Sequence, residues 1–214
     1  YGQHRVDGFA AFAAKVEEFV RVAADYGSDI VVFPELFTLQ LLSAEPALLP
    51  PGAAVERLSE HTADFTALLQ RLAVQYRINI VGGTHPTRTP EGTLRNICYV
   101  ATRDGALHRR DKLHITPSEQ GSWAVGGGDD AGVIATDAGP VGVMVCYDSE
   151  FPELGRHLVD QRALVLFVPY CTDVRQGHLR VRYSCQARAV ENQVYVVAAG
   201  NVGHCPNVAN FDIQ

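Results

Sequence analysis

The sequence predicts an α/β protein in which helices pack against a mixed β-sheet. Two helix-then-strand units come first, a tight hairpin follows, and three continuous apolar runs occupy the second half. A hairpin needs an antiparallel pair, whereas continuous apolar runs are typical of strands covered on both faces. We therefore expect a mixed sheet, or two sheets if the antiparallel strands fold over the others.

The first half of the chain contains the two helix-then-strand units. Apolar residues at steps of three and four mark the first helix: Phe9, Phe12, Ala13, Val16, Phe19, Val20 and Ala23. The same spacing marks the second helix: Phe65, Leu68, Leu69, Leu72 and Tyr76. Such spacing places the apolar side chains on one helix face. Short strands are predicted directly after these helices, over residues 30–33 and 78–81.

The hairpin is predicted from its turn. Its strands cover residues 97–102 and 106–110, on either side of Asp104 and Gly105, a pair that is typical of hairpin turns. After it, three glycines and two aspartates fill residues 126–130. No G-K-[ST] follows them, as a phosphate-binding loop would require, so this stretch is interpreted as a plain surface loop.

Buried strands and two further helices complete the predicted fold. The apolar runs lie at 141–145, 164–168 and 195–199. Helices are expected between them, over residues 152–162 and 179–192. Neither an internal repeat nor a low-complexity linker interrupts the sequence. The 214 residues are therefore expected to form one domain.

Composition excludes several classes of protein. With 47% hydrophobic and 20% charged residues, the chain resembles an ordinary globular domain. A net charge of -6 leaves no excess positive charge to neutralise phosphates, so nucleic acid is not an expected partner. Apolar runs fall short of the roughly 20 residues that span a bilayer, and the start does not resemble a secretory signal. We expect a cytoplasmic protein that is not associated with membranes.

The five cysteines raise the question of a nucleophile. They are Cys98, Cys146, Cys171, Cys185 and Cys205. Their odd number, wide scatter and lack of a C-x-x-C pair argue against a disulfide framework and against a zinc site. We expect no metal and no cofactor. Most of these cysteines are interpreted as small buried residues, and the question is whether one of them has a nucleophile's surroundings.

Cys146 is the candidate nucleophile. It ends the apolar run 141–145 and precedes a predicted helix at Pro152. A strand-to-helix turn holds such a side chain rigidly, while the backbone N–H groups that follow can stabilise an oxyanion. A cysteine at a strand end is nevertheless more often structural. The assignment depends on its partners.

Glu35 and Lys112 are the candidate partners, because each also ends a predicted strand. A carboxylate beside apolar residues can have a raised pKa and act as a general base. An ammonium group near an attacked carbonyl balances the oxyanion and lowers the pKa of a neighbouring thiol. Taken singly, Glu35 could equally be a helix N-terminal or surface acid, and Lys112 a solvated hairpin lysine.

Taken together and in this order, the three resemble the nitrilase or carbon-nitrogen hydrolase superfamily. The resemblance rests on these strings: Phe33-Pro34-Glu35, Asp111-Lys112-Leu113-His114, Cys146-Tyr147-Asp148, Phe151-Pro152-Glu153 and residues 186–192, Gln-Ala-Arg-Ala-Val-Glu-Asn. It covers nearly the whole chain. The resemblance implies a four-layer αββα fold and a thioester intermediate that water hydrolyses.

The resemblance also implies a role for each residue. Glu35 would be the general base, Lys112 the electrostatic stabiliser and Cys146 the nucleophile. The family's second glutamate falls on Glu119, which would position the lysine and the substrate. The oxyanion would contact Lys112 and the backbone N–H of Tyr147. Cys171 and Thr172 complete the expected substrate-binding set.

Longer strings resemble one branch of the superfamily. They are residues 112–119, 146–154, 168–173 and 179–182. That branch often carries a GNAT-type acetyltransferase domain before the hydrolase, and the sequence contains no such domain. Compared with the family, the chain opens at Tyr1, where a first core strand should have just ended, and stops at Gln214 before the last strands. We expect a fragment that lacks those strands, and a homodimer or a multiple of one through the helices at 152–162 and 179–192.

Several alternatives stay open at this point. A cysteine–histidine hydrolase could use His114 or His157 as its base, although neither lies in a recognisable pattern. A non-catalytic module could bind an amide or acyl ligand with the same side chains. Nitriles are an alternative to the favoured small amide or carbamoyl substrate. A basic stretch could receive a substrate carboxylate or be a solvated helix start: Arg175, His178, Arg180 and Arg182.

Overall fold

The computed structural model describes residues 1–205 and 207–208 as two β-sheets between two layers of helices. The first sheet has the order β2 (Ile30–Val32), β3 (Asn79–Arg88), β4 (Leu94–Ala101) and β5 (Leu107–Asp111), with β6 (Val125–Gly126) also paired to β4. The second has the order β10 (Tyr195–Gly200), β9 (Val165–Tyr170), β8 (Gly139–Val143) and β7 (Ile134–Thr136). Both sheets are mixed, as predicted.

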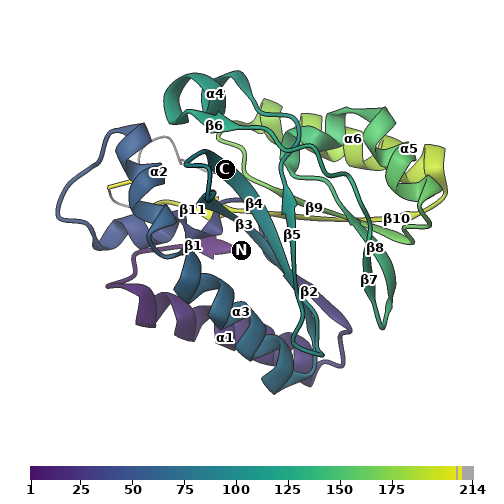
Figure 1. Cartoon of the computed structure of the whole chain (residues 1–214), viewed down its shortest axis with the longest axis horizontal. Coiled ribbons are helices and arrows are strands. Elements are labelled where there is room, and N and C mark those ends of the chain that lie inside the picture. The colour runs from purple at the N-terminus through teal and green to yellow at the C-terminus, as the bar shows by residue number, and fades with distance from the viewer. Residues whose placement is uncertain (206, 209–214) are drawn as a thin grey trace.

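The helices form the outer layers (Figure 1). The first sheet is covered by α1 (Phe9–Asp25) and α3 (Thr62–Tyr76), and the second by α5 (Pro152–Asp160) and α6 (Arg175–Asn192). Shorter elements are η1 (Phe37–Ala44), α2 (Pro51–Ser59), α4 (Pro117–Trp123) and η2 (Cys146–Glu150). A small parallel pair joins β1 (Gly2–Gln3) to β11 (Val202–Gly203). The expected αββα order of layers is confirmed.

Apolar side chains alternate between the two faces of β4, which explains why the layers stack. Ile97 and Tyr99 pack into the cluster under α1 and α3, whereas Cys98 and Val100 pack into the cluster shared with the second sheet. Side chains two residues apart lie on the same face of a strand, so one strand supplies both cores. The predicted hairpin is also confirmed, since β4 and β5 pair antiparallel.

One expectation about burial was wrong. The run at 195–199 does form a strand, β10, but Tyr195 and Val197 are 79% and 39% exposed. In the described part of the chain, β10 is the edge of its sheet and pairs only with β9. A continuous apolar run predicts a strand, but it does not predict how many neighbouring strands and helices cover that strand.

The sequence patterns missed the short helices η1, α2 and α4. Their apolar repeats are too short to produce a helical period. No helix in residues 1–205 is long and apolar enough to cross a membrane.

Candidate active site

Three strand ends from the two sheets meet in one pocket. Glu35 follows β2, Lys112 follows β5, and Cys146 follows β8 at the start of η2. They line a pocket of about 570 Å³ and are 2%, 2% and 7% exposed. The structure therefore brings the three predicted side chains into one pocket, although they span 111 residues of the chain from first to last.

Lys112 is held between two carboxylates. Its Nζ donates to Glu35 Oε1 at 2.8 Å and to Glu119 Oε1 and Oε2 at 3.0 and 2.8 Å. Burial by itself would lower the pKa of Lys112, but the negative charges of Glu35 and Glu119 outweigh it and hold that pKa well above its usual value. The ammonium group is therefore charged and fixed in place.

Glu35 has the environment of a general base. Its Oε1 also accepts from Asn96 Nδ2 at 3.0 Å, and its Oε2 accepts from the backbone N–H of Cys171 at 3.0 Å. Burial raises the pKa of Glu35, the charge of Lys112 opposes this rise, and the charge of Glu119 adds to it. A carboxylate with a raised pKa accepts a proton more readily.

The backbone around Glu35 is pinned from two sides. Thr84 Oγ1 accepts from the backbone N–H of Leu36 at 2.9 Å. Asn201 Nδ2 donates to the backbone carbonyl of Glu35 at 2.6 Å. Both side chains are buried, so these bonds fix the direction in which the carboxylate points.

Glu119 starts α4 and is oriented by that helix end. Thr116 and Glu119 form a capping box, in which each side chain bonds the other's backbone N–H. Asn96 Nδ2 donates to Glu119 Oε1 at 3.1 Å. Burial would raise the pKa of Glu119, but Lys112 and Thr116 outweigh it and lower that pKa, so this carboxylate stays ionised. The structure thus brings Glu119 to Lys112, as the resemblance implied.

Cys146 occupies a strained turn. Its φ of 49° is in the left-handed region, which non-glycine residues rarely adopt. Ser149 Oγ donates to the Cys146 carbonyl at 2.7 Å and holds the turn. The thiol Sγ lies 3.7 Å from the backbone carbonyl of Cys171.

The expectation that Lys112 gives Cys146 a low pKa was wrong for the resting site. Burial and the charge of Glu35 raise the pKa of the Cys146 thiol well above its usual value, and the opposing effect of Lys112 is smaller. The resting nucleophile is therefore a neutral thiol.

Asp148 joins the cysteine turn to the lysine loop. It accepts from the backbone N–H of Val145 at 2.9 Å, and from both the backbone N–H and Nδ1 of His114 at 2.8 Å. His114 also stacks on Phe151, with ring centroids 3.5 Å apart. The side chain of His114 is thus engaged in holding the two segments together, and it is not among the residues that line the pocket.

The glycine stretch at 126–130 is a surface loop, as predicted, and it also packs on the segment that carries Lys112. Gly128 N donates to the backbone carbonyl of Lys112 at 2.9 Å. A Cβ on Gly127 would lie 2.6 Å from the Leu113 carbonyl, and a Cβ on Gly128 would overlap Asp111 Cβ. Only glycine allows this close approach, so the loop packs directly on the backbone that carries the catalytic lysine candidate.

The remaining predicted site residues also line the pocket. They are Tyr147, Cys171 and Thr172, together with Asp173 and Arg180 near the mouth. Arg180 Nε donates to Glu150 at 2.6 Å. Among residues 1–205, no group of three His, Cys, Asp or Glu side chains is arranged to hold a metal ion.

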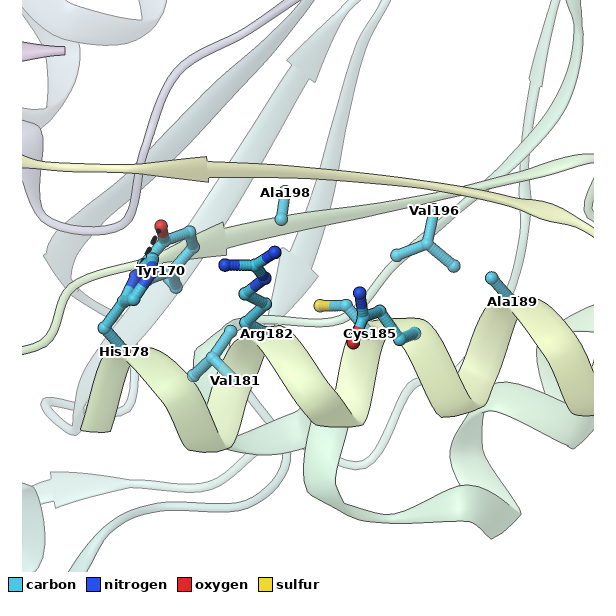
Figure 2. A pocket seen from close by; sticks show the side chains of 9 residues that line it. Tyr170, His178, Val181, Arg182, Cys185, Ala189, Val196 and Ala198 are labelled. Carbon is cyan, nitrogen blue, oxygen red and sulfur yellow. Dashed lines mark hydrogen bonds between the residues drawn. The ribbon is translucent and has the colours of Figure 1, made fainter. Parts of the chain in front are cut away.

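The basic stretch on α6 does not act as one unit. Arg180 lines the pocket described above, whereas His178 and Arg182 line a second hollow of about 230 Å³ between α6 and the strands β9 and β10 (Figure 2). There His178 Nδ1 lies 3.2 Å from the hydroxyl of Tyr170. Helical periodicity separates side chains that are adjacent in the sequence.

Asn96, Asp148 and Asn201 were missed by the sequence reasoning. Each is a polar residue that is almost fully buried. Asn96 offered no clear signal, since it lies just before the predicted strand 97–102 and only the structure extends that strand to include it. Their partners in other segments are 23 to 166 residues away, so no local pattern names them.

Comparison with known proteins agrees with this geometry. The sequence profile described as carbon-nitrogen hydrolase matches residues 3–212. "Probable hydrolase YhcX" of Bacillus subtilis is 47% identical over the whole chain, which covers 41% of that relative. A deaminated glutathione amidase of Synechocystis is 30% identical over 204 residues, which are 88% of this chain and 71% of the relative. The chain thus spans less than half the length of the Bacillus protein.

Solved structures share the fold. Saccharomyces cerevisiae Nit3, a member of branch 10 of the nitrilase superfamily, superposes with a TM-score of 0.76 at 25% identity, covering 94% of this chain and 73% of Nit3. A carbon-nitrogen hydrolase from Helicobacter pylori gives a TM-score of 0.79 at 20% identity, covering 100% and 78%. Because the profile match spans almost every residue and the buried Glu–Lys–Cys arrangement accompanies it, the chain belongs to the carbon-nitrogen hydrolase family.

Proposed function

We propose that this protein hydrolyses the non-peptide C–N bond of a small amide or carbamoyl compound through a thioester on Cys146. The observation that carries the proposal is the meeting of a buried thiol, a carboxylate with a raised pKa and a charged lysine in one pocket. These are a nucleophile, its base and an electrostatic stabiliser for an oxyanion.

In the first half-reaction, the Cys146 thiol gives its proton to Glu35 as its sulfur attacks the amide carbon. The carbonyl π electrons move to oxygen, and the resulting oxyanion faces Lys112 and the backbone N–H of Tyr147. The C–N bond then breaks, and Glu35 returns the proton to the departing nitrogen. Ammonia or an amine leaves, and an acyl thioester remains.

In the second half-reaction, Glu35 takes a proton from water as the oxygen attacks the thioester carbon. Collapse of the second oxyanion breaks the C–S bond, and the sulfur recovers a proton from Glu35 as the acid leaves. Glu119 holds the ammonium group of Lys112 in position throughout. The same three side chains therefore serve both half-reactions.

Pocket chemistry favours small polar substrates. Besides the reacting groups, the lining includes the hydroxyls of Thr116, Ser118, Ser122 and Thr172 and the ring of Trp123. Arg180 is half exposed at the mouth and uses Nε on Glu150, which leaves its terminal nitrogens to meet a substrate carboxylate.

The test is a panel of primary amides, N-carbamoyl compounds and nitriles, with released ammonia as the readout. We expect turnover of at least one amide or carbamoyl compound, an acyl adduct on Cys146 by intact mass, and neither result in Cys146→Ala. Turnover of nitriles alone would favour nitrile hydrolysis by the same residues. Binding without turnover or adduct would favour a non-catalytic ligand-binding module.

The assembly is proposed separately. Tyr183 and Val190 lie on α6 and are 60% and 73% exposed, so the outer layer offers an apolar patch that a second copy could cover. We infer a homodimer or a multiple of one.

The five free cysteines suit a reducing compartment such as the cytoplasm. A fused acetyltransferase domain stays a prediction.

A further inference from the structure

Asn96 occupies a position that the mechanism above does not use. It lies on β4, is almost fully buried, and its Nδ2 donates to Glu35 Oε1 at 3.0 Å and to Glu119 Oε1 at 3.1 Å. Carboxylate oxygens only accept hydrogen bonds when ionised, so the amide nitrogen must face them. Both amide hydrogens are thereby used, one on each carboxylate.

The amide oxygen of Asn96 indicates that this arrangement has an energetic cost. Its Oδ1 is buried and has no hydrogen-bond partner among the residues that the structure describes. An unsatisfied buried acceptor is unfavourable, and an apolar side chain of similar size would avoid it. Such a replacement would, however, remove the two hydrogen bonds to the carboxylates.

The two carboxylate oxygens of Glu35 accept different numbers of hydrogen bonds. Oε1 accepts from Lys112 and from Asn96, which together occupy both of its lone pairs. Oε2 accepts the backbone N–H of Cys171, so one lone pair remains for a proton.

The position of the thiol agrees with this division. The same residue, Cys171, donates its N–H to Glu35 Oε2 at 3.0 Å and presents its carbonyl to Cys146 Sγ at 3.7 Å. One peptide segment therefore touches both the candidate acceptor oxygen and the sulfur that must lose a proton. The Cys146 thiol is also within hydrogen-bond reach of the Glu35 carboxylate.

We propose that Asn96 is a positioning residue that, with Lys112, occupies Oε1 of Glu35 and so makes Oε2 the atom that exchanges protons with Cys146 and the leaving group. Asn96 also places a donor between Glu35 and Glu119. This donor prevents the two carboxyl groups from sharing one proton, as neighbouring carboxyls otherwise do. The inference rests on the proposed amide hydrolysis.

The expected effect of Asn96→Leu is a change in pH dependence. Glu35 faces Lys112, Glu119, Cys146 and Cys171, and these groups stay in place when only the amide is removed. Loss of a hydrogen bond to the charged form favours protonated Glu35. We expect the acid limb of kcat against pH to move upward by about one pH unit, since a hydrogen bond to an ionised group is worth roughly that much. At pH values below the limb kcat should fall about tenfold, with KM little changed.

A matched control comes from Asn79 on β3. This asparagine is also fully buried, and it bonds the Asp29 carbonyl and Asp137, outside the set of residues that line the pocket. Asn79→Leu should weaken the fold at least as much as Asn96→Leu, yet leave the acid limb where it is in the wild type. Thermal unfolding of each variant verifies the comparison. If Asn96→Leu does not fold, Asn96→Ser keeps one donor and should give a smaller upward shift.

A second readout does not depend on finding a substrate. Iodoacetamide alkylation of Cys146, located by mass spectrometry and measured against pH, reports the Glu35–Cys146 proton equilibrium directly. Its acid limb should shift upward in Asn96→Leu even if no amide is hydrolysed, which separates this inference from the proposed function. The inference is wrong if folded Asn96→Leu and Asn96→Ser keep the wild-type limb, or if Asn79→Leu shifts it equally.

Discussion

Lys112 is the residue on which most of the site's charge depends. Its ammonium group bonds both Glu35 and Glu119 in a buried pocket, so its removal has two effects. An oxyanion loses its stabiliser, and two carboxylates lose their counter-ion. Lys112→Ala should therefore lower kcat by at least about a hundredfold, or roughly 3 kcal/mol, with a lower melting temperature.

The other members of the site should respond differently. Cys146→Ala should abolish turnover while substrate binding persists, and Glu35→Gln should slow both half-reactions. Because these residues act as a unit, double variants should lose little more than the worst single variant. The exposed His157 is the control, and His157→Ala should retain activity. Near-normal turnover in Lys112→Ala with none in His114→Ala would contradict this assignment of roles.

At the level of elements, the glycine loop after β6 fixes the strand end that carries Lys112. A methyl group on Gly128 would overlap the Asp111 side chain and push on the backbone beside the lysine. Gly128→Ala should lower kcat by roughly ten- to a hundredfold, because small displacements of a catalytic group are that costly. Steady-state kinetics and thermal unfolding would measure both effects.

Gly121 is a matched control for that substitution. It lies within α4, where a Cβ would meet no atom within 4 Å. Gly121→Ala should raise the free energy of unfolding by about 0.5–1 kcal/mol, since alanine is the better helix former, and leave kcat unchanged. Equal activity in the two alanine variants would show that the loop does not position Lys112.

For the whole molecule, stability in acid should depend on His85. This buried histidine on β3 bonds Thr38 and Thr62, and burial lowers its pKa to about 3 from a usual 6.5. Above the usual pKa, both the folded and unfolded states hold it neutral, so the full stability is present. Below that value the unfolded state gains a proton that the folded state does not. Stability should therefore fall by about 1.4 kcal/mol per pH unit as pH drops toward the lowered pKa.

The measurement is urea unfolding of the wild type and of His85→Gln at several pH values. The variant should be less stable at neutral pH, because glutamine does not reproduce both threonine contacts. Its stability should decline less steeply in acid. Parallel slopes for the two proteins would contradict the role given to His85.

Self-association is also a property of the whole molecule. If α6 pairs with a second copy, a charge at Tyr183 or Val190 should disrupt the pair, since both lie on its exposed surface. Sedimentation at micromolar concentration should give a dimer or larger for the wild type and a smaller species for Val190→Glu. A monomeric wild type with both side chains exposed would count against a dimer.

The sequence by itself determined the main elements and the three reactive residues. Periodicity of apolar residues found α1 and α3, because a helix must bury one face, and a turn pair found the β4–β5 hairpin. Glu35, Lys112 and Cys146 were recognisable because each stands in a distinctive local string. Those signals lie within short stretches of sequence, so they can be recognised without three-dimensional information.

Only the tertiary structure decided the pKa shifts and the hydrogen-bond partners of those residues. The high pKa of the Cys146 thiol follows from burial and from Glu35, which comes from another sheet. Asn96 donates hydrogen bonds to two carboxylates that lie 61 and 23 residues away in the chain. Desolvation and hydrogen bonding depend on which groups meet in space, and a local pattern does not contain that information.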